Sequence, residues 1–122
     1  MEFVTFEIAK KLKDLGFNEP FFFYYREDEK DKYVHHANIS KPLIYCDKID
    51  NEVIIAPTIA QVLKWLREKH KIYMYVKRDT YHFKFRFVYE KDKPRGEFTS
   101  SVYDGFEQAA IEGIKYVIDN SI

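Results

Sequence analysis

Residues 56–70 read Ala-Pro-Thr-Ile-Ala-Gln-Val-Leu-Lys-Trp-Leu-Arg-Glu-Lys-His, and the rest of the fold can be laid out around this stretch. It predicts a helix that begins at Thr58, because Gln61 three residues later completes a capping box in which each side chain satisfies an amide of the helix end. Apolar residues then recur at helical spacing and predict one buried stripe: Ile59, Val62, Leu63 and Leu66. We expect Trp65 beside this stripe, covering its edge.

Two further helices are predicted toward the ends of the chain. The first runs from Phe6 to Leu15, with Thr5 as its N-cap and Gly16 as a left-handed stop. The last opens at Asp104 and has small residues that permit close packing on a sheet. The side chains that it is expected to bury are Phe106, Ala109, Ala110, Gly113, Ile114 and Val117.

Strands are predicted between the helices, because eleven Phe and ten Tyr favour a core built on a sheet. The extended segments are expected near residues 21–25, 33–37, 43–46, 52–56, 72–77, 81–90 and 97–99. The predicted fold class is α+β. A single two-layer domain over residues 1–122 would pack three helices on one antiparallel sheet of about four to six strands, in an order of roughly αββ-αββ-α.

Alternation along residues 72–90 predicts a hairpin with one apolar face. With a connection of two residues (79–80) or four (78–81), Val76 pairs with Phe83, and the six apolar residues of this pair and of the next two fall on the same side. The other predicted pairs are Met74 with Phe85 and Ile72 with Phe87. We expect this inner face to pack against Leu63, Leu66, Ala110 and Ile114.

The opposite face of the same hairpin mixes aromatic rings with cations. Its predicted members are Tyr73, Tyr75, Lys77, His82, Lys84 and Arg86. Residues 64–95 contain eleven Lys or Arg and four Asp or Glu in a chain without net charge. Rings for base stacking and cations for phosphates are what single-stranded nucleic acid requires. The same composition also suits an ordinary solvated sheet face or a protein contact.

Bulk composition excludes several classes of protein. Twenty basic and twenty acidic residues cancel, so no global charge favours nucleic acid or an anionic membrane. One cysteine, Cys46, excludes an internal disulfide and a cysteine-rich zinc site. The N-terminus lacks the pattern of a signal peptide, and no apolar run approaches the roughly 20 residues of a membrane span. We expect a cytoplasmic protein without a membrane partner.

No motif for catalysis or cofactor binding is found. His35 and His36 are adjacent on a predicted strand, so they point to opposite faces and cannot chelate one ion together. The four glycines are scattered and make no phosphate loop. We therefore assign no catalytic, cofactor-binding or metal-ligating residue and expect no enzyme. An enzyme would need a deep pocket that gathers polar residues distant in sequence.

Three segments resemble one family of small proteins encoded by phages, prophages and mobile elements of gut anaerobic bacteria. The matching patterns are Phe3-x-x-Phe6-Glu7-Ile8-Ala9-x-x-Leu12-x-x-x-Gly16-Phe17, Ala56-Pro57-Thr58-x-x-Gln61-x-x-x-Trp65-Leu66-Arg67-Glu68-x-His70-x-Ile72, and Tyr103-x-x-Phe106-Glu107-x-Ala109 with Gly113-Ile114. The family has no established activity, so the resemblance implies bacterial or phage cytoplasm and an accessory role without transferring any site residue.

The functional expectation has two branches. The first is a non-enzymatic accessory protein of a phage or mobile element that acts through protein–protein binding. The alternative is single-stranded nucleic-acid binding through the face from Tyr73 to Arg86. Salt discriminates the two branches, because phosphate contacts weaken steeply with added salt and an aromatic protein interface changes little. The identity of the partner and the oligomeric state are left open.

Overall fold

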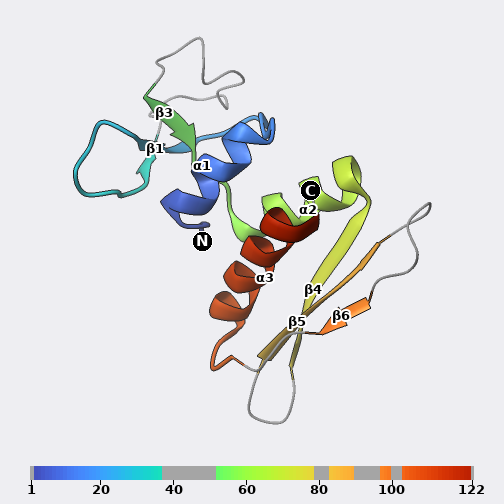
Figure 1. The fold of residues 1–122 in the computed structure, drawn as a ribbon. Coiled ribbons are helices and arrows are strands. Elements are labelled where there is room, and N and C mark those ends of the chain that lie inside the picture. Colours follow the sequence, from blue (N-terminus) through green and yellow to red (C-terminus); the bar gives the residue numbers. More distant parts are fainter. Residues whose placement is uncertain (1, 37–51, 79–82, 90–96, 100–102, 122) are drawn as a thin grey trace. The chain divides into compact units, whose positions relative to one another are not determined.

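The computed structural model describes residues 2–36, 52–78, 83–89, 97–99 and 103–121 (Figure 1). Its elements, in chain order, are α1 (Phe6–Asp14), β1 (Phe23–Arg26), β2 (His35–His36), β3 (Val53–Ile55), α2 (Ile59–His70), β4 (Ile72–Arg78), β5 (Phe83–Tyr89), β6 (Glu97–Thr99) and α3 (Phe106–Ser121). The predicted α+β class and the three helices are confirmed. The expected strand near residues 43–46 lies outside the described residues, as does Cys46.

The described strands form two three-stranded antiparallel sheets, with strand orders β2-β1-β3 and β4-β5-β6, where one sheet was predicted. Strand β4 pairs with β5, which follows it in the chain, whereas β3 pairs with β1 and not with β2, the strand before it. The chain divides correspondingly into two compact units, Phe3–Thr58 and Ile59–Ile122, here called unit 1 and unit 2. One domain spanning residues 1–122 stays a prediction.

Helix α1 of unit 1 is delimited by the residues that the sequence indicated. The amide of Ile8 donates to Oγ1 of Thr5 at 3.4 Å, which caps the first turn. Gly16 has φ +88°, and the amide of Phe17 returns to the carbonyl of Leu12 at 2.9 Å. Both the N-cap and the left-handed stop are therefore confirmed, although the helix ends at Asp14, one residue before the expected Leu15.

The small sheet of unit 1 has β1 at its centre and β3 at its most buried edge. Each of the three β3 side chains is buried, and α1 packs against this strand. The segment before α1 is tied to the end of unit 1 by the amide of Val4, which donates to the carbonyl of Pro57 at 3.1 Å. Aromatic rings fill the space around β1, including Phe3 against Phe23 with ring centroids 4.9 Å apart.

The buried stripe of helix α2, in unit 2, differs from the predicted one at a single residue, because Trp65 is buried in place of Leu63. Its buried side chains are Ile59, Val62, Trp65 and Leu66, whereas Leu63 is half-buried. Trp65 follows Val62 by three positions and Leu66 follows it by four, so both lie on the same helix face. The indole was expected to cover the edge of the stripe. It is only 5% exposed and belongs to the core.

The hairpin of β4 and β5 confirms the predicted faces and corrects the predicted register. Val76 pairs with Phe85 and not with Phe83, and Met74 pairs with Phe87. Strand β4 extends to Arg78, so the connection comprises the four residues 79–82. A shift of two positions keeps every residue on its own face, because the strand period is two. Alternation therefore indicated the face correctly but could not distinguish registers two residues apart.

Helices α2 and α3 cover one face of the β4-β5-β6 sheet (Figure 1). On β4, Ile72 and Met74 are buried beneath them. The residues that α3 buries in unit 2 are Ala109, Ala110, Gly113, Ile114, Val117 and Ile118. The expected burial of Phe106 is wrong, because its side chain is 45% exposed. Helical side chains tilt toward the N-terminus, so a ring at the first position of α3 extends past the end of the helix.

Candidate functional site

The face of the β4-β5-β6 sheet opposite the two helices carries the ring-and-cation pattern that the sequence indicated. Tyr73 is 41% exposed and Tyr75 is 44% exposed, and Lys77 continues the row on β4. The backbone register places Arg86 opposite Tyr75 and Lys84 opposite Lys77. This set of five residues is called the tyrosine–lysine face below.

Strand β6 extends the same face by two positions. Thr99 pairs with Arg86, and Glu97 pairs with Val88, which itself pairs with Tyr73. The Lys77–Lys84 pair therefore lies at the end of the face near the connection 79–82. Glu97 lies at the opposite end. His82, the sixth predicted member, lies outside the described residues.

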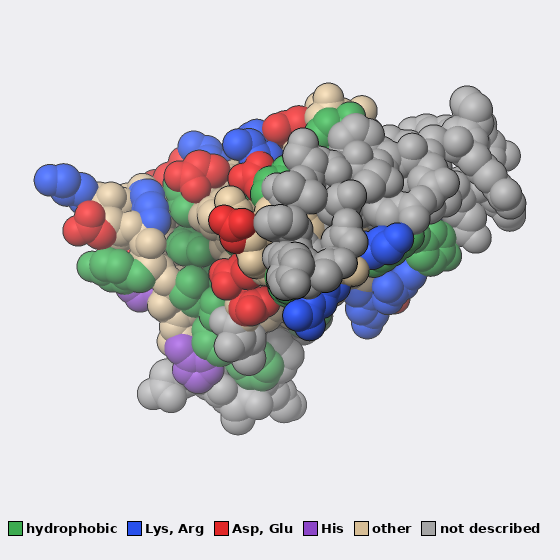
Figure 2. Space-filling view, turned by 90° about the horizontal axis from the view of Figure 1, so that it is seen from below, with side chains coloured by type: hydrophobic (Ala, Val, Ile, Leu, Met, Phe, Trp, Pro, Cys, Tyr) green, Lys and Arg blue, Asp and Glu red, His purple; other side chains and the backbone are tan. Residues whose placement is uncertain are grey.

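Charged side chains of both signs are found on the described surface. Figure 2 shows both Lys or Arg and Asp or Glu side chains on a single face of the molecule. This matches a chain with twenty basic and twenty acidic residues. The three cationic residues of the tyrosine–lysine face are therefore a local excess along two strands of a chain without net charge.

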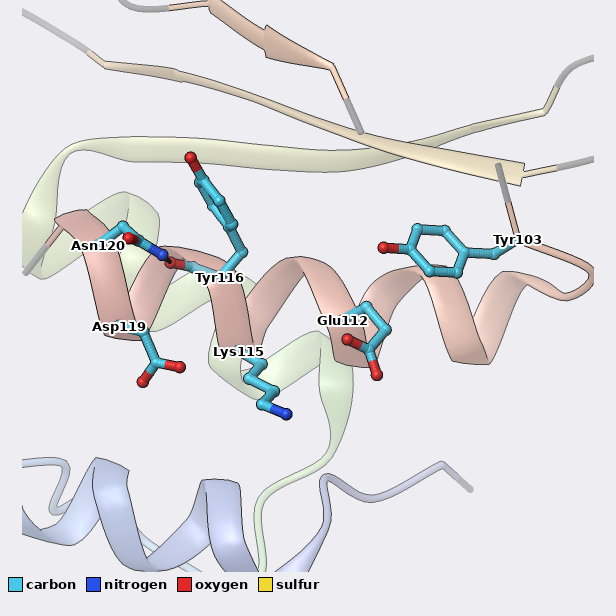
Figure 3. Close-up of a pocket in the computed structure, with 6 residues that line it drawn as sticks. All are labelled: Tyr103, Glu112, Lys115, Tyr116, Asp119 and Asn120. Carbon is cyan, nitrogen blue, oxygen red and sulfur yellow. Dashed lines mark hydrogen bonds between the residues drawn. The ribbon is translucent and has the colours of Figure 1, made fainter. Parts of the chain in front are cut away.

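A pocket of about 200 Å³ lies along the flank of α3 in unit 2 (Figure 3). Its lining consists of Tyr103, Glu112, Lys115, Tyr116, Asp119 and Asn120. Each of the five helical members lies three or four positions from another, which places them on one side of the helix. Figure 3 shows the phenol of Tyr116 extending toward the strands, with Glu112 and Asp119 along the other edge of the same flank.

Tyr103 is held in this pocket by its backbone. Its amide donates to the carbonyl of Phe83 at 2.7 Å, and its carbonyl accepts from the amide of Phe83 at 2.8 Å. Burial raises the pKa of the Tyr103 phenol, and the negative charge of Glu112 raises it further. The pocket therefore combines an aromatic ring whose backbone is fixed to β5 with a nearby carboxylate. No sequence motif pointed to it, since Tyr103 is separated from Glu112 by eight residues and the sheet brings them together.

Unit 1 contains a polar cluster around the turn that follows β1. The ammonium of Lys32 donates to the carbonyls of Arg26 at 3.2 Å and Glu27 at 2.5 Å, and also to that of Glu29. The same ammonium lies 4.7 Å from the centroid of the Phe6 ring. Lys32 thus closes the turn by satisfying several backbone acceptors with one cation.

The two adjacent histidines have separate surroundings. The imidazole of His35 contacts the carboxylate of Glu29 and stacks on Tyr24, with ring centroids 5.2 Å apart. The ring of His36 lies against Phe23 at 4.9 Å. Within the part of the chain that the structure describes, no three His, Cys, Asp or Glu side chains are placed to hold a metal ion. His35 is accounted for by its carboxylate and aromatic neighbours.

Comparison of the chain with family models, with curated proteins and with solved structures finds no match. Among the described residues, no helix has the length and the apolar character needed to cross a membrane. Functional inference therefore rests on the geometry of the tyrosine–lysine face and of the α3 pocket.

Proposed function

We propose that this chain is a non-enzymatic binding protein that holds single-stranded nucleic acid on its tyrosine–lysine face. The observation that carries the proposal is the exposure of two phenol rings, Tyr73 and Tyr75, on one strand whose next outward residue is the cation Lys77. Residues two apart on a strand are roughly 7 Å from each other, so each ring offers a separate base-stacking surface.

The free energy of base stacking on two rings limits the affinity that the rings alone can give. Stacking one base on an aromatic side chain contributes about 1–3 kcal/mol, so two rings supply about 2–6 kcal/mol. That sum alone corresponds to dissociation constants no tighter than tens of micromolar, about 4 × 10⁻⁵ M. Phosphate contacts from Lys77, Lys84 and Arg86 must supply the remainder, and they make binding dependent on salt.

A protein partner is the second candidate function, although protein–protein binding is the first expectation from the sequence. Exposed tyrosines suit protein interfaces, where they add large contact area at low entropic cost. The Glu97 position on the same sheet face disfavours phosphate at that end and favours a partner with its own cations. A cytoplasmic accessory role in a phage or mobile element also belongs to this proposal, and it rests on the sequence resemblance.

The test is fluorescence anisotropy of labelled single-stranded RNA and DNA oligonucleotides at low and physiological salt. One variant removes the rings (Tyr73→Ala with Tyr75→Ala), and another removes the cations (Lys77→Ala, Lys84→Ala and Arg86→Ala). Exposed residues of α2 give a control matched in charge, with two lysines and one arginine removed, in Lys64→Ala with Arg67→Ala and Lys69→Ala.

Salt-dependent binding that both face variants lose and the α2 control retains supports the proposal. With three phosphate contacts, the logarithm of the association constant is expected to fall with the logarithm of salt concentration with a slope of about −2. An absence of binding at low salt, or equal losses in the control, overturns it. Pull-down with the same variants then tests the protein branch.

A further inference from the structure

The pocket on the flank of α3 has two chemically different edges. One edge is aromatic and is made by the rings of Tyr103 and Tyr116, and the other carries Glu112 and Asp119, with Lys115 between them (Figure 3). The face of a phenol ring carries the negative end of its quadrupole, so both edges favour positive charge. The described lining holds two carboxyl-bearing residues and one lysine, Lys115, a composition that suits a cationic ligand better than a phosphate or a carboxylate.

The pocket is small and built on rigid elements. A volume of about 200 Å³ is below the roughly 300–1,000 Å³ of sites for drug-sized ligands, so it suits the head of a side chain. Tyr103 is bridged to β5 through its backbone, and Tyr116 projects from a helix whose opposite side is buried. The amide nitrogen of Asn120 donates to the carbonyl of Tyr116 at 2.9 Å. The oxygen of the same side-chain amide is then the atom that can accept a hydrogen bond from a ligand.

A guanidinium group matches these features better than an ammonium does. It is planar and stacks on aromatic faces, and its fork of N–H donors pairs with carboxylates in two-point geometry. A stem of three methylenes also lies well along a narrow flank. We propose that the α3 pocket binds a guanidinium group, as free arginine or as an arginine side chain of a peptide. This inference is independent of the function proposed for the tyrosine–lysine face.

The test is an NMR titration of the full chain, which follows the ring protons of the tyrosines and the amides of α3. Three probes are added separately: L-arginine, an N-acetylated and C-amidated Gly-Arg-Gly peptide, and the corresponding citrulline peptide. Citrulline has the shape of arginine without its charge. Saturation by the arginine probes at low millimolar concentration, with at least tenfold weaker binding of citrulline, is expected. Preference between L-arginine and the peptide distinguishes a free ligand from a peptide partner.

Variants of opposite sign make the test specific. Glu112→Gln is expected to weaken arginine binding about three- to tenfold, and Tyr116→Leu to weaken it by a similar factor. Lys115→Gln is expected to strengthen it, because it removes the like charge from the lining. A variant that merely damages the fold cannot bind more tightly. Glu107→Gln makes the same charge change on α3 at an exposed position outside the pocket and serves as the control.

Three results would overturn the inference. The first is an absence of saturable shifts up to about 20 mM arginine probe, which lies below useful affinity. The second is equal binding of citrulline and arginine. The third is an equal loss in Glu107→Gln and Glu112→Gln, which would assign the effect to net charge and not to the pocket.

Discussion

The hydroxyl of Tyr25 donates a 2.7 Å hydrogen bond to the backbone carbonyl of Val4, twenty-one positions earlier in the chain. Both residues are buried, with Tyr25 6% exposed and Val4 fully covered. The bond joins the segment before α1 to the centre of the small sheet. It also satisfies a carbonyl and a phenol that would otherwise be buried at a cost in free energy.

Replacing Tyr25 by Phe is expected to lower the free energy of unfolding by about 1–2 kcal/mol, because it leaves the carbonyl of Val4 without this donor while keeping the ring. Urea unfolding followed by circular dichroism measures the change. Tyr33→Phe is the matched control, since that phenol is 59% exposed. Equal stability of Tyr25→Phe and the parent chain would mean that the bond contributes nothing measurable.

Alkaline pH is expected to destabilise the chain in part through the same phenol. Burial raises the pKa of Tyr25, and the charge of Glu7 raises it further. The native state therefore keeps its proton at a pH where the unfolded chain, with a tyrosine pKa of about 10, has begun to lose it. Stability is present in full below about pH 10 and is lost as pH rises through the folded-state pKa. Urea unfolding at pH 8 and at pH 10.5 should show a smaller alkaline loss for Tyr25→Phe than for the parent, and identical losses would contradict this.

Gly16 is expected to tolerate substitution poorly for reasons of backbone conformation alone. Its φ of +88° is strained for residues with a Cβ, although nothing lies within 4 Å of a Cβ placed there. Gly16→Ala should cost about 1–2 kcal/mol in the free energy of unfolding, and Gly16→Asn should cost less, because asparagine adopts the left-handed region more readily. Thermal unfolding of the two variants measures the difference. Equal costs for alanine and asparagine would point to a cause other than φ.

At Lys71 the opposite substitution, to glycine, is expected to stabilise the fold. Lys71 lies between α2 and β4 with φ +56°, a left-handed conformation that a lysine pays to adopt. Lys71→Gly is expected to raise the free energy of unfolding by about 0.5–1 kcal/mol, since glycine is the favoured residue just after a helix. Lys69→Gly, within the helix, should instead lower it by about 1 kcal/mol. A destabilised Lys71→Gly variant would show that the lysine side chain contributes more than its backbone costs.

The rings of the tyrosine–lysine face should be dispensable for folding. Because Tyr73 and Tyr75 are both more than 40% exposed, Tyr73→Ala with Tyr75→Ala is expected to change the free energy of unfolding by less than about 1 kcal/mol. Thermal unfolding checks this before any binding assay. A larger loss would assign the rings to sheet stability, through cross-strand packing, and would weaken their case as a binding surface.

The amino-acid sequence by itself determined the features that depend on neighbours within a few positions. The start of α1 at Thr5 follows from a side chain that reaches an amide three residues away, and its stop follows from a glycine that can adopt positive φ. Alternation along β4 and β5 likewise assigned each residue to its face, because consecutive side chains of a strand point to opposite sides. The rings and cations of the tyrosine–lysine face could be found for the same reason.

Only the tertiary structure decided which distant segments meet. The division into two sheets depends on the pairing of β3 with β1, and the pairing of Val76 with Phe85 depends on where the connection 79–82 begins. The exposure of Phe106 and the α3 pocket beside Tyr103 arise from how one helix end lies against a strand. Local patterns repeat every two or 3.6 residues and are equally compatible with several such arrangements, so long-range packing selects among them.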